Sequence, residues 1–366
     1  MRSIFSPNGG DLLQDTKERH GSAPLAWLFR AVLLLLAAVV AAGALTPKAW
    51  AAGTEDTRCV IPLGQAVGIK LFAQGVLVVG LSDISTDQGL ASPAKACGLQ
   101  EGDVITHIND EKVSSIEEVQ TILQDSNGQE LELSVLRDQA CLEVTTRAAQ
   151  CSADGAYKLG AWIRDSMAGI GTLTFVEPAT GLFGTLGHGI NDVDTAELMK
   201  LQSGAITPAS VSNIVKGMDG RPGELRGAFA SGEDLGTLFA NTECGVFGHF
   251  NDPQSLTGQA IPVATPQQVH EGSATILANI VGSTVEEYSV EIQKVCRDAS
   301  DTRDLVLKVT DPRLLEQTGG IVQGMSGSPI LQDGRLVGAV THVLIDHADR
   351  GYGIFAQRML EAAESN

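Results

Sequence analysis

The sequence is poor in positive charge, and this limits the partners that the protein can have. Its 25 Lys and Arg residues face 44 Asp and Glu residues, which gives a formal net charge of −19 at pH 7. A nucleic-acid-binding protein needs a basic surface to neutralise phosphates, and an acidic chain gains nothing from an anionic membrane surface. Nucleic acid is therefore not expected as a partner, and the acidity indicates a well-solvated surface.

Metal-binding patterns are missing as well. The chain has six cysteines, none of which forms a Cys-x-x-Cys pair, so we expect no zinc site. The mechanism predicted below implies no metal or organic cofactor. An even number of cysteines in an exported chain permits disulfides without requiring them, which leaves the redox state open. Cys97 lies among small apolar residues, and we expect it to be packed rather than paired.

What is present is the composition of a globular protein rich in turns. A chain of 366 residues is long enough for about two domains, each with a core of its own. Hydrophobic residues make up 43% of the chain and there are 41 glycines, while aromatic residues contribute only 4%. Short Val, Ile and Leu runs between frequent glycines favour a mainly β fold, and nothing indicates disorder or a coiled coil.

Residues 1–52 have the pattern of an export segment. The stretch Leu25–Leu45 is apolar apart from Arg30, and basic residues precede it, which predicts that the following chain lies outside the cytoplasm. Without Arg30 the apolar run is short for a membrane-spanning helix, but the arginine can snorkel and lengthen it. The small residues of Ala49-Trp50-Ala51 fit a cleavage site, so a cleaved signal and a retained anchor both stay open.

Residues 60–150 alternate between strand and helix patterns. Val104–Ile108 has the apolar alternation of a strand and is followed by an Asn-Asp turn. Residues 115–123 have helical spacing with Ser114 or Ser115 as the N-cap, and residues 131–135 alternate again. These patterns predict a small α+β module.

The run from Ser92-Pro93-Ala94 to Asn109 resembles PDZ domains of the bacterial peptidase type. Such domains bind an extended peptide by strand addition, often at its C-terminal carboxylate. The resemblance implies a carboxylate-binding loop within Val67–Leu71, where a glycine would let backbone N–H groups turn towards an anion. The predicted peptide-binding residues are Gly68, Ile69, Lys70 and Leu71.

Residues 155–366 contain many short strands punctuated by glycine, which indicates a barrel or a sandwich. His188 stands in the motif Gly-Thr-Leu-Gly-His-Gly-Ile-Asn-Asp, where flanking glycines leave an imidazole open to a substrate. An isolated histidine is more often structural, but the glycines around His188 and the serine motif that follows it make a catalytic role the better interpretation. We interpret His342, close after that serine motif, as structural.

The segment Gly324-Met325-Ser326-Gly327-Ser328-Pro329 is close to the nucleophile segment of chymotrypsin-like serine peptidases. A nucleophile on a tight turn projects its hydroxyl, and converging N–H groups bind the oxyanion of the tetrahedral intermediate. We predict Ser326 as the nucleophile, His188 as its base, and the N–H groups of Gly324 and Ser326 as the oxyanion hole. The order His before Ser argues against an α/β-hydrolase.

A carboxylate is needed to hold the tautomer of the imidazole. The residue types alone do not choose among five candidates, which are Asp192, Asp194, Asp234, Asp252 and Asp311.

The region 60–360 as a whole resembles the stage IV sporulation protein B (SpoIVB) serine peptidases. The motifs that carry this resemblance surround His188, Thr310-Asp311-Pro312 and the run Leu314–Ile330. The resemblance implies a PDZ-like module followed by a chymotrypsin-like double β-barrel. It also implies a triad of His188, Asp311 and Ser326, with Asp234 as the reserve for the acid.

The family resemblance also implies a biological setting. Such a peptidase is exported to the space between the two membranes of the developing spore, where it cuts a regulatory membrane protein and so leads to activation of a late sigma factor. Self-cleavage near the export segment is implied too, for which the polar stretch Ala51–Arg58 is suited. Two alternatives stay open: a non-catalytic PDZ scaffold, and a general quality-control peptidase outside the cytoplasm.

Overall fold

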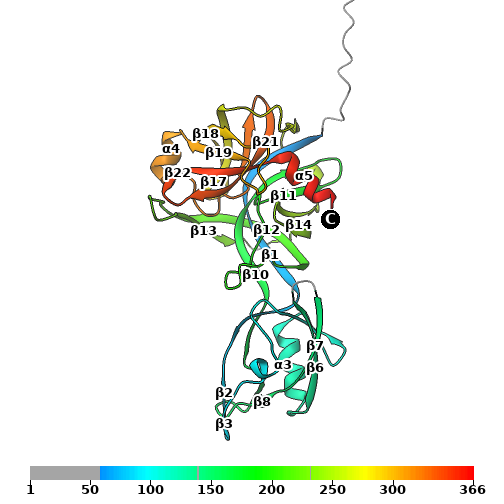
Figure 1. Ribbon diagram of the computed structural model, residues 1–366. Helices are drawn as coiled ribbons and strands as arrows, with labels where there is room; N and C mark the ends of the chain where they lie inside the picture. Colours follow the sequence, from blue (N-terminus) through cyan, green and yellow to red (C-terminus); the bar gives the residue numbers. More distant parts are fainter. Residues whose placement is uncertain (1–57, 138–139, 231) are drawn as a thin grey trace, which may run out of the picture. The chain divides into compact units, whose positions relative to one another are not determined.

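The computed structural model describes residues 58–137, 140–230 and 232–366, which form a mainly β protein (Figure 1). The predicted export segment, residues 1–52, lies outside these described residues. Within the described ranges, the helices are all too short or too polar to cross a membrane.

A first barrel is built from six long or medium strands. They are β1 (Cys59–Leu81), β10 (Ala161–Val176), β11 (Leu182–Thr185), β12 (Leu201–Val215), β14 (Gly236–Thr242) and β15 (Gly245–Phe250). The pairing order runs β12-β14-β15-β11-β10-β1, and β12 pairs again with β1, which closes the ring. Two short strands, β13 (Glu224–Phe229) and β16 (Ile261–Pro262), extend it at β12 and β1. Buried side chains fill its interior, among them Leu173, Phe183 and Ile206.

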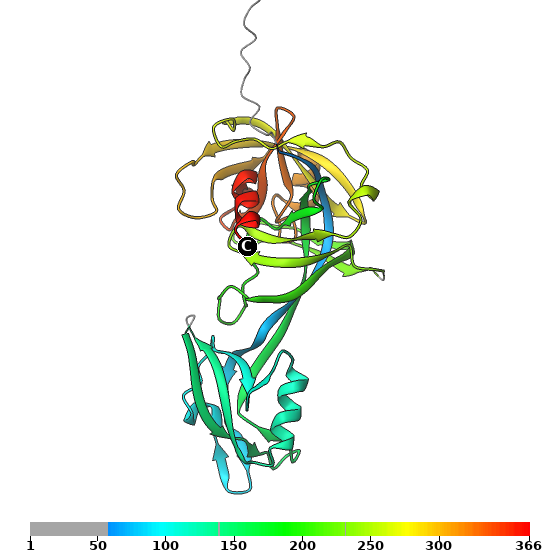
Figure 2. The same ribbon diagram turned by 90° about the vertical axis from the view of Figure 1, so that its right-hand side faces the viewer.

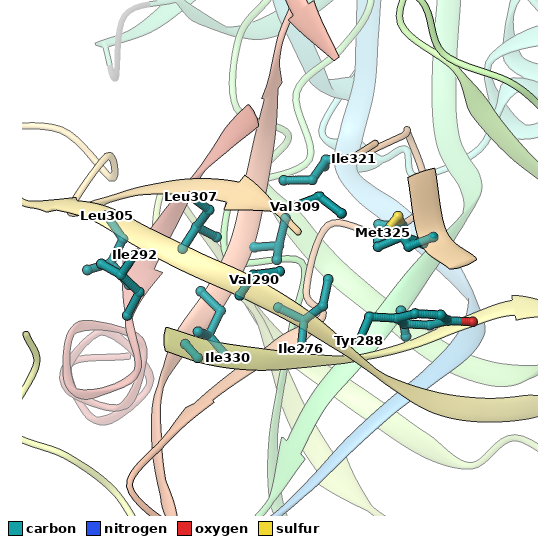
Figure 3. Packing of buried hydrophobic residues seen from close by; sticks show 14 of the residues in the cluster. Ile276, Tyr288, Val290, Ile292, Leu305, Leu307, Val309, Ile321, Met325 and Ile330 are labelled. Atoms are coloured by element: carbon teal, nitrogen blue, oxygen red, sulfur yellow. The ribbon is translucent and has the colours of Figure 1, made fainter. Parts of the chain in front are cut away.

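A second closed barrel follows along the chain. Its strands are β17 (Gly272–Val281), β18 (Thr284–Val295), β19 (Leu305–Val309), β20 (Pro329–Gln332), β21 (Arg335–Leu344) and β22 (His347–Phe355). Alternate residues of these strands point inward, as period-2 alternation requires, and Ile276, Val290 and Leu307 meet in the core (Figure 3). Helix α4 (Pro312–Thr318) lies between β19 and β20, and α5 (Ala356–Glu364) packs against the barrel strands β21 and β22.

The PDZ-like part contains β4 (Val104–Ile108), β6 (Glu130–Arg137) and β7 (Ala140–Arg147), which pair in sequence order, and helix α3 (Ile116–Asp125). Ser115 caps α3 in a capping box with Glu118, as the sequence predicts for this start. The smaller elements are β2 (Ile84–Thr86), β3 (Gly89–Ala91), α2 (Pro93–Ala96), β5 (Glu111–Lys112), β8 (Ala149–Gln150), β9 (Tyr157–Lys158) and, later in the chain, the 3₁₀ turn η1 (Pro253–Ser255). Cys97 packs partly buried against this core, as expected.

Strands β1 and β10 run side by side through both parts of the chain (Figure 2). Residues Ile61–Phe72 of β1 pair with β10 in the first barrel, whereas Val76 and Leu77 pair with β4 of the PDZ-like part. The first barrel therefore contains residues that the sequence analysis assigned to the PDZ-like domain.

This register corrects the expectation of a carboxylate-binding loop. Gly68, Ile69, Lys70 and Leu71 pair with β10 on one side and with β12 on the other. A strand between two neighbours has its N–H groups in the sheet ladders, so it has none to offer a carboxylate. Gly68 has a different use, because a Cβ there would lie 2.5 Å from the ring of Phe229.

Candidate active site

Ser326 lies on a tight turn that leads into β20. The turn is framed by Gly324 and Gly327, with φ values of +95° and +97°. At Gly327 a Cβ atom would lie 2.2 Å from the carbonyl oxygen of Thr172 in β10, so the close approach of the two barrels requires a glycine here. Thr172 binds the same turn, because its hydroxyl donates to the carbonyl of Gly324 over 2.8 Å.

Two N–H groups of this turn point to no acceptor among the described residues. Met325 donates to the carbonyl of Val322 and Gly327 donates to that of Val340, whereas the N–H groups of Gly324 and Ser326 make no such bond. Backbone N–H groups are normally satisfied, and a pair left open next to a serine is the arrangement of an oxyanion hole. The predicted pair is therefore placed on the same turn as the hydroxyl.

The hydroxyl of Ser326 is partly buried and donates to the carbonyl oxygen of Thr341 over 2.6 Å. Thr341 belongs to β21, directly before His342. In this orientation the hydroxyl of Ser326 donates its hydrogen bond to a carbonyl oxygen, which cannot act as a general base. Nucleophilic attack requires the O–H to turn from Thr341 towards an imidazole.

His188 follows strand β11 and contacts its own neighbour. Its Nδ1 lies 2.8 Å from the carbonyl oxygen of Gly189. A carbonyl only accepts hydrogen bonds, so Nδ1 carries the proton and Nε2 keeps the lone pair that a general base needs. Burial lowers the pKa of His188 below its ordinary value of 6.5, which keeps the ring neutral near pH 7.

The loop after His188 is held by two polar side chains, Asn241, which the sequence analysis did not single out, and Asp192, which it named as a candidate acid. The amide of Asn241 donates to the carbonyls of Ile190 and Met199 and accepts from the N–H of Ile190. Asp192 is buried, forms an ion pair with Arg164 and accepts backbone N–H groups of its own loop. Three bonds by one amide fix the backbone two residues beyond the imidazole.

A second imidazole lies against the first. The ring of His342 is 4.9 Å from that of His188, tilted by 35°. Desolvation and the neighbouring His188 lower the pKa of His342 to about 4, so it is uncharged near neutral pH. The sequence analysis interprets His342 as structural, and the structure places its ring beside His188 in the same cavity.

These groups line one cavity of about 520 Å³. Its lining includes His188, Ser326, Thr341 and His342 together with Gly324. Residues far apart in the sequence, one from each barrel, therefore meet at one surface depression. Among the residues that the structure describes, no carboxylate lines it, and none of the five candidate aspartates is present.

Asp311 lies elsewhere in the second barrel. It is the N-cap of α4, where its carboxylate accepts from the backbone and the guanidinium of Arg313 and from the N–H of Ser289. The hydrogen bonds from Arg313 lower the pKa of Asp311 to about 2. The structure thus brings His188 and Ser326 together and does not bring Asp311 to them, because its oxygens are used by the helix end.

Replacing Asp311 by alanine should destabilise the protein. Loss of an N-cap and of bonds to a guanidinium is expected to lower the free energy of unfolding by about 1–3 kcal/mol, measured by urea denaturation. Arg313→Gln serves as the control, because it removes the guanidinium that binds Asp311 and keeps Asp311 as the N-cap of α4. Unchanged stability together with a loss of kcat on the order of 10⁴-fold would instead make Asp311 the triad acid of the working enzyme.

The pH dependence of activity distinguishes a dyad from a triad. A neutral base whose pKa is lowered by burial loses activity only when the pH falls below 6.5, so the acid limb of the kcat/KM profile should lie below that value. A carboxylate bonded to His188 would stabilise the imidazolium and raise its pKa. An acid limb above 6.5 that persists in His342→Gln would therefore contradict the geometry described above.

No group of three or more His, Cys, Asp or Glu side chains suited to a metal ion occurs in residues 58–137, 140–230 or 232–366. The cavity brings together a serine hydroxyl and a neutral imidazole, which are the groups that serine peptidases use for nucleophilic attack. Two β-barrels that each contribute one of these groups define the class of the protein, which is a serine endopeptidase.

The family is shown by direct comparison. Residues 155–360, more than half of the chain, match the family model "SpoIVB peptidase S55", and the chain belongs to that family. Residues 84–137 match the model of a PDZ domain. Both matches confirm the resemblance seen in the sequence. A search of curated proteins finds no match.

Solved structures of the Rv3671c protease are similar to parts of the chain. The inactive form is 14% identical, with 54% of this chain and 84% of that chain covered and a TM-score of 0.32. The active form, from M. tuberculosis, is 13% identical, with 55% of this chain and 74% of that chain covered and a TM-score of 0.30.

Proposed function

We propose that this serine endopeptidase is exported and cuts a regulatory membrane protein in a sporulation signalling pathway, and that this cut leads to activation of a late sigma factor. The proposal rests on membership of the SpoIVB family and on one observation, the shared cavity of His188 and Ser326. Self-cleavage within or near Ala51–Arg58 is part of the proposal.

The proposed reaction is hydrolysis of a peptide bond through an acyl-enzyme. Ser326 leaves the carbonyl of Thr341, gives its proton to Nε2 of His188 and attacks the scissile carbonyl. The N–H groups of Gly324 and Ser326 bind the oxyanion, and His188 returns the proton to the leaving amine. Water then releases the acyl group by the same route in reverse.

The proposed partner of the PDZ-like part is an extended peptide. A cavity of about 1090 Å³ is lined by α3 and by the first residues of β10, including Trp162 and Ile163. Ala161–Arg164 pair with β1, and no described strand pairs with their other edge. An open strand edge beside a helix suits strand addition, in place of the loop expected from the sequence.

The proposed location is the space between the two membranes of the developing spore. Membership of the SpoIVB family supports a secreted or membrane-associated peptidase. A peptidase with a membrane protein as its substrate needs to work at a membrane surface, to which the predicted export segment would bring it.

Labelling with a fluorophosphonate tests the catalytic part. The reagent should modify the protein once, and mass mapping should place the adduct on Ser326, because only an activated serine reacts. His188→Ala should label far more slowly, since the base is missing, whereas His249→Ala changes a histidine outside the cavity and should label normally. An unlabelled protein with intact fold would favour the non-catalytic scaffold.

A further inference from the structure

The cavity beside Ser326 has apolar walls on both sides of the nucleophile turn. Ile321 and Val322, each only 2% exposed, lie just before the turn and line it. Val343 and Ile345, after the nucleophile in sequence, line it from the end of β21. Because Ser326 lines the same cavity, a substrate side chain that enters here lies beside the bond that Ser326 would attack.

No charged side chain contributes to this lining. Asp, Glu, Lys and Arg are absent from the residues that surround the cavity, although the described chain is rich in them elsewhere. A charged group of a substrate would lose water in this cavity without gaining an oppositely charged partner from the lining. An apolar side chain would lose nothing and would bury its surface.

The rim of the cavity exposes apolar side chains, beside the charged residues Asp219 and Arg221 of one turn. The turn at residues 218–222 contributes Pro222 to the lining and is tied to the opposite wall, because the N–H of Gly220 donates to the carbonyl of Ile345 over 2.8 Å. Met218 in this turn is 57% exposed and Ile345 is 60% exposed. Large apolar side chains left in water at the mouth of an apolar cavity are typical of a contact surface.

We infer that the enzyme cuts after an uncharged apolar residue, whose side chain lies against Ile321, Val322, Val343 and Ile345. This inference rests on the proposed function and names its substrate class. A cavity of about 520 Å³ is larger than one such side chain, so a neighbouring substrate residue also finds apolar surface, at Ile69 and Met167.

Internally quenched peptides that differ only in the residue before the scissile bond test this. We expect kcat/KM to be at least about 100-fold higher with Leu than with Lys or Glu. Ile345→Asp places a carboxylate at the rim, where it tolerates water, and should raise the Lys:Leu ratio at least about 10-fold. Val343→Asp repeats the change deeper in the cavity.

Val281→Asp is the matched control. Val281 is 57% exposed at the end of β17 and does not line the cavity, so its replacement adds the same charge and should leave the preference unchanged. Fluorophosphonate labelling of every variant reports the nucleophile separately from the preference. A labelled enzyme that prefers Lys or Glu overturns the inference and leaves the proposed function standing.

A second measurement does not depend on catalysis. The Ser326→Ala protein should bind fluorescent peptide amides that present Leu more tightly than those that present Lys or Glu, by at least about 10-fold. A peptide amide can still add to the open strand edge of the PDZ-like part, so the cavity is reported by Ile345→Asp in the same background, which should raise the affinity for the Lys peptide relative to the Leu peptide. Equal affinities would overturn the inference even if the fluorophosphonate result had removed the enzyme assignment.

Discussion

Ser326→Ala is expected to reduce peptide cleavage by about 10⁴- to 10⁶-fold. The substitution removes the oxygen that attacks the substrate and leaves the backbone N–H groups of the turn in place. Among the described residues, the one hydrogen bond that the hydroxyl makes, and that the substitution deletes, is to the carbonyl of Thr341. The measurement is kcat/KM on a quenched peptide, with the far-ultraviolet spectrum and the unfolding midpoint as checks on the fold.

Ser328→Ala is the matched control, because Ser328 lies two residues away in the same turn, is buried, and has a hydroxyl without a partner among the described residues. It should keep most of the activity. If Ser326→Ala retained cleavage at the wild-type rate, the assignment of the nucleophile would be refuted, whatever the geometry of the turn.

Gly327→Ala is expected to be the most damaging change to the architecture of the site. The residue has a left-handed φ of +97°, and a Cβ there would lie 2.2 Å from the carbonyl oxygen of Thr172. The backbone conformation alone costs about 1–2 kcal/mol, and the overlap forces the two barrels apart at the nucleophile turn. We expect a loss of more than about 3 kcal/mol in the free energy of unfolding, with loss of fluorophosphonate labelling.

The control for this prediction is Gly334→Ala. Gly334 has a φ of +72°, but a Cβ there would meet no atom within 4 Å, so only the backbone cost of about 1 kcal/mol applies. Equal destabilisation by the two substitutions, measured by urea denaturation, would show that the contact between Gly327 and Thr172 is unimportant for stability.

That His188 and Ser326 share one cavity could be predicted, because each residue stands in a motif that is local in sequence. A nucleophile on a tight turn needs glycines beside it, and Gly324 and Gly327 can be recognised in the sequence alone. The helix at α3 was equally predictable, since its capping box and apolar spacing lie within ten residues. The role of Asn241 was not, because its bonds reach residues 42 and 51 positions away, and a single amide has no pattern.

The predicted PDZ loop failed for a different reason. The pattern of Gly68, Ile69, Lys70 and Leu71 suits a loop that contains a glycine. It suits equally a strand in which the glycine makes room for a side chain packed closely against it. Pairing with β12, more than 130 residues later, decides between them. Asp311 illustrates a similar limit, because an aspartate before a proline is both a triad candidate and a good helix cap.

Strand β1 enters the first barrel before the PDZ-like part begins, and β10 returns to that barrel after it. The PDZ-like part is therefore an insertion between two neighbouring strands of the catalytic domain, rather than a separate domain that precedes it. A chain that began at residue 155 would lack β1, a strand that closes the barrel carrying His188. Proteolytic removal of N-terminal residues is therefore compatible with activity only up to about Cys59, where β1 begins.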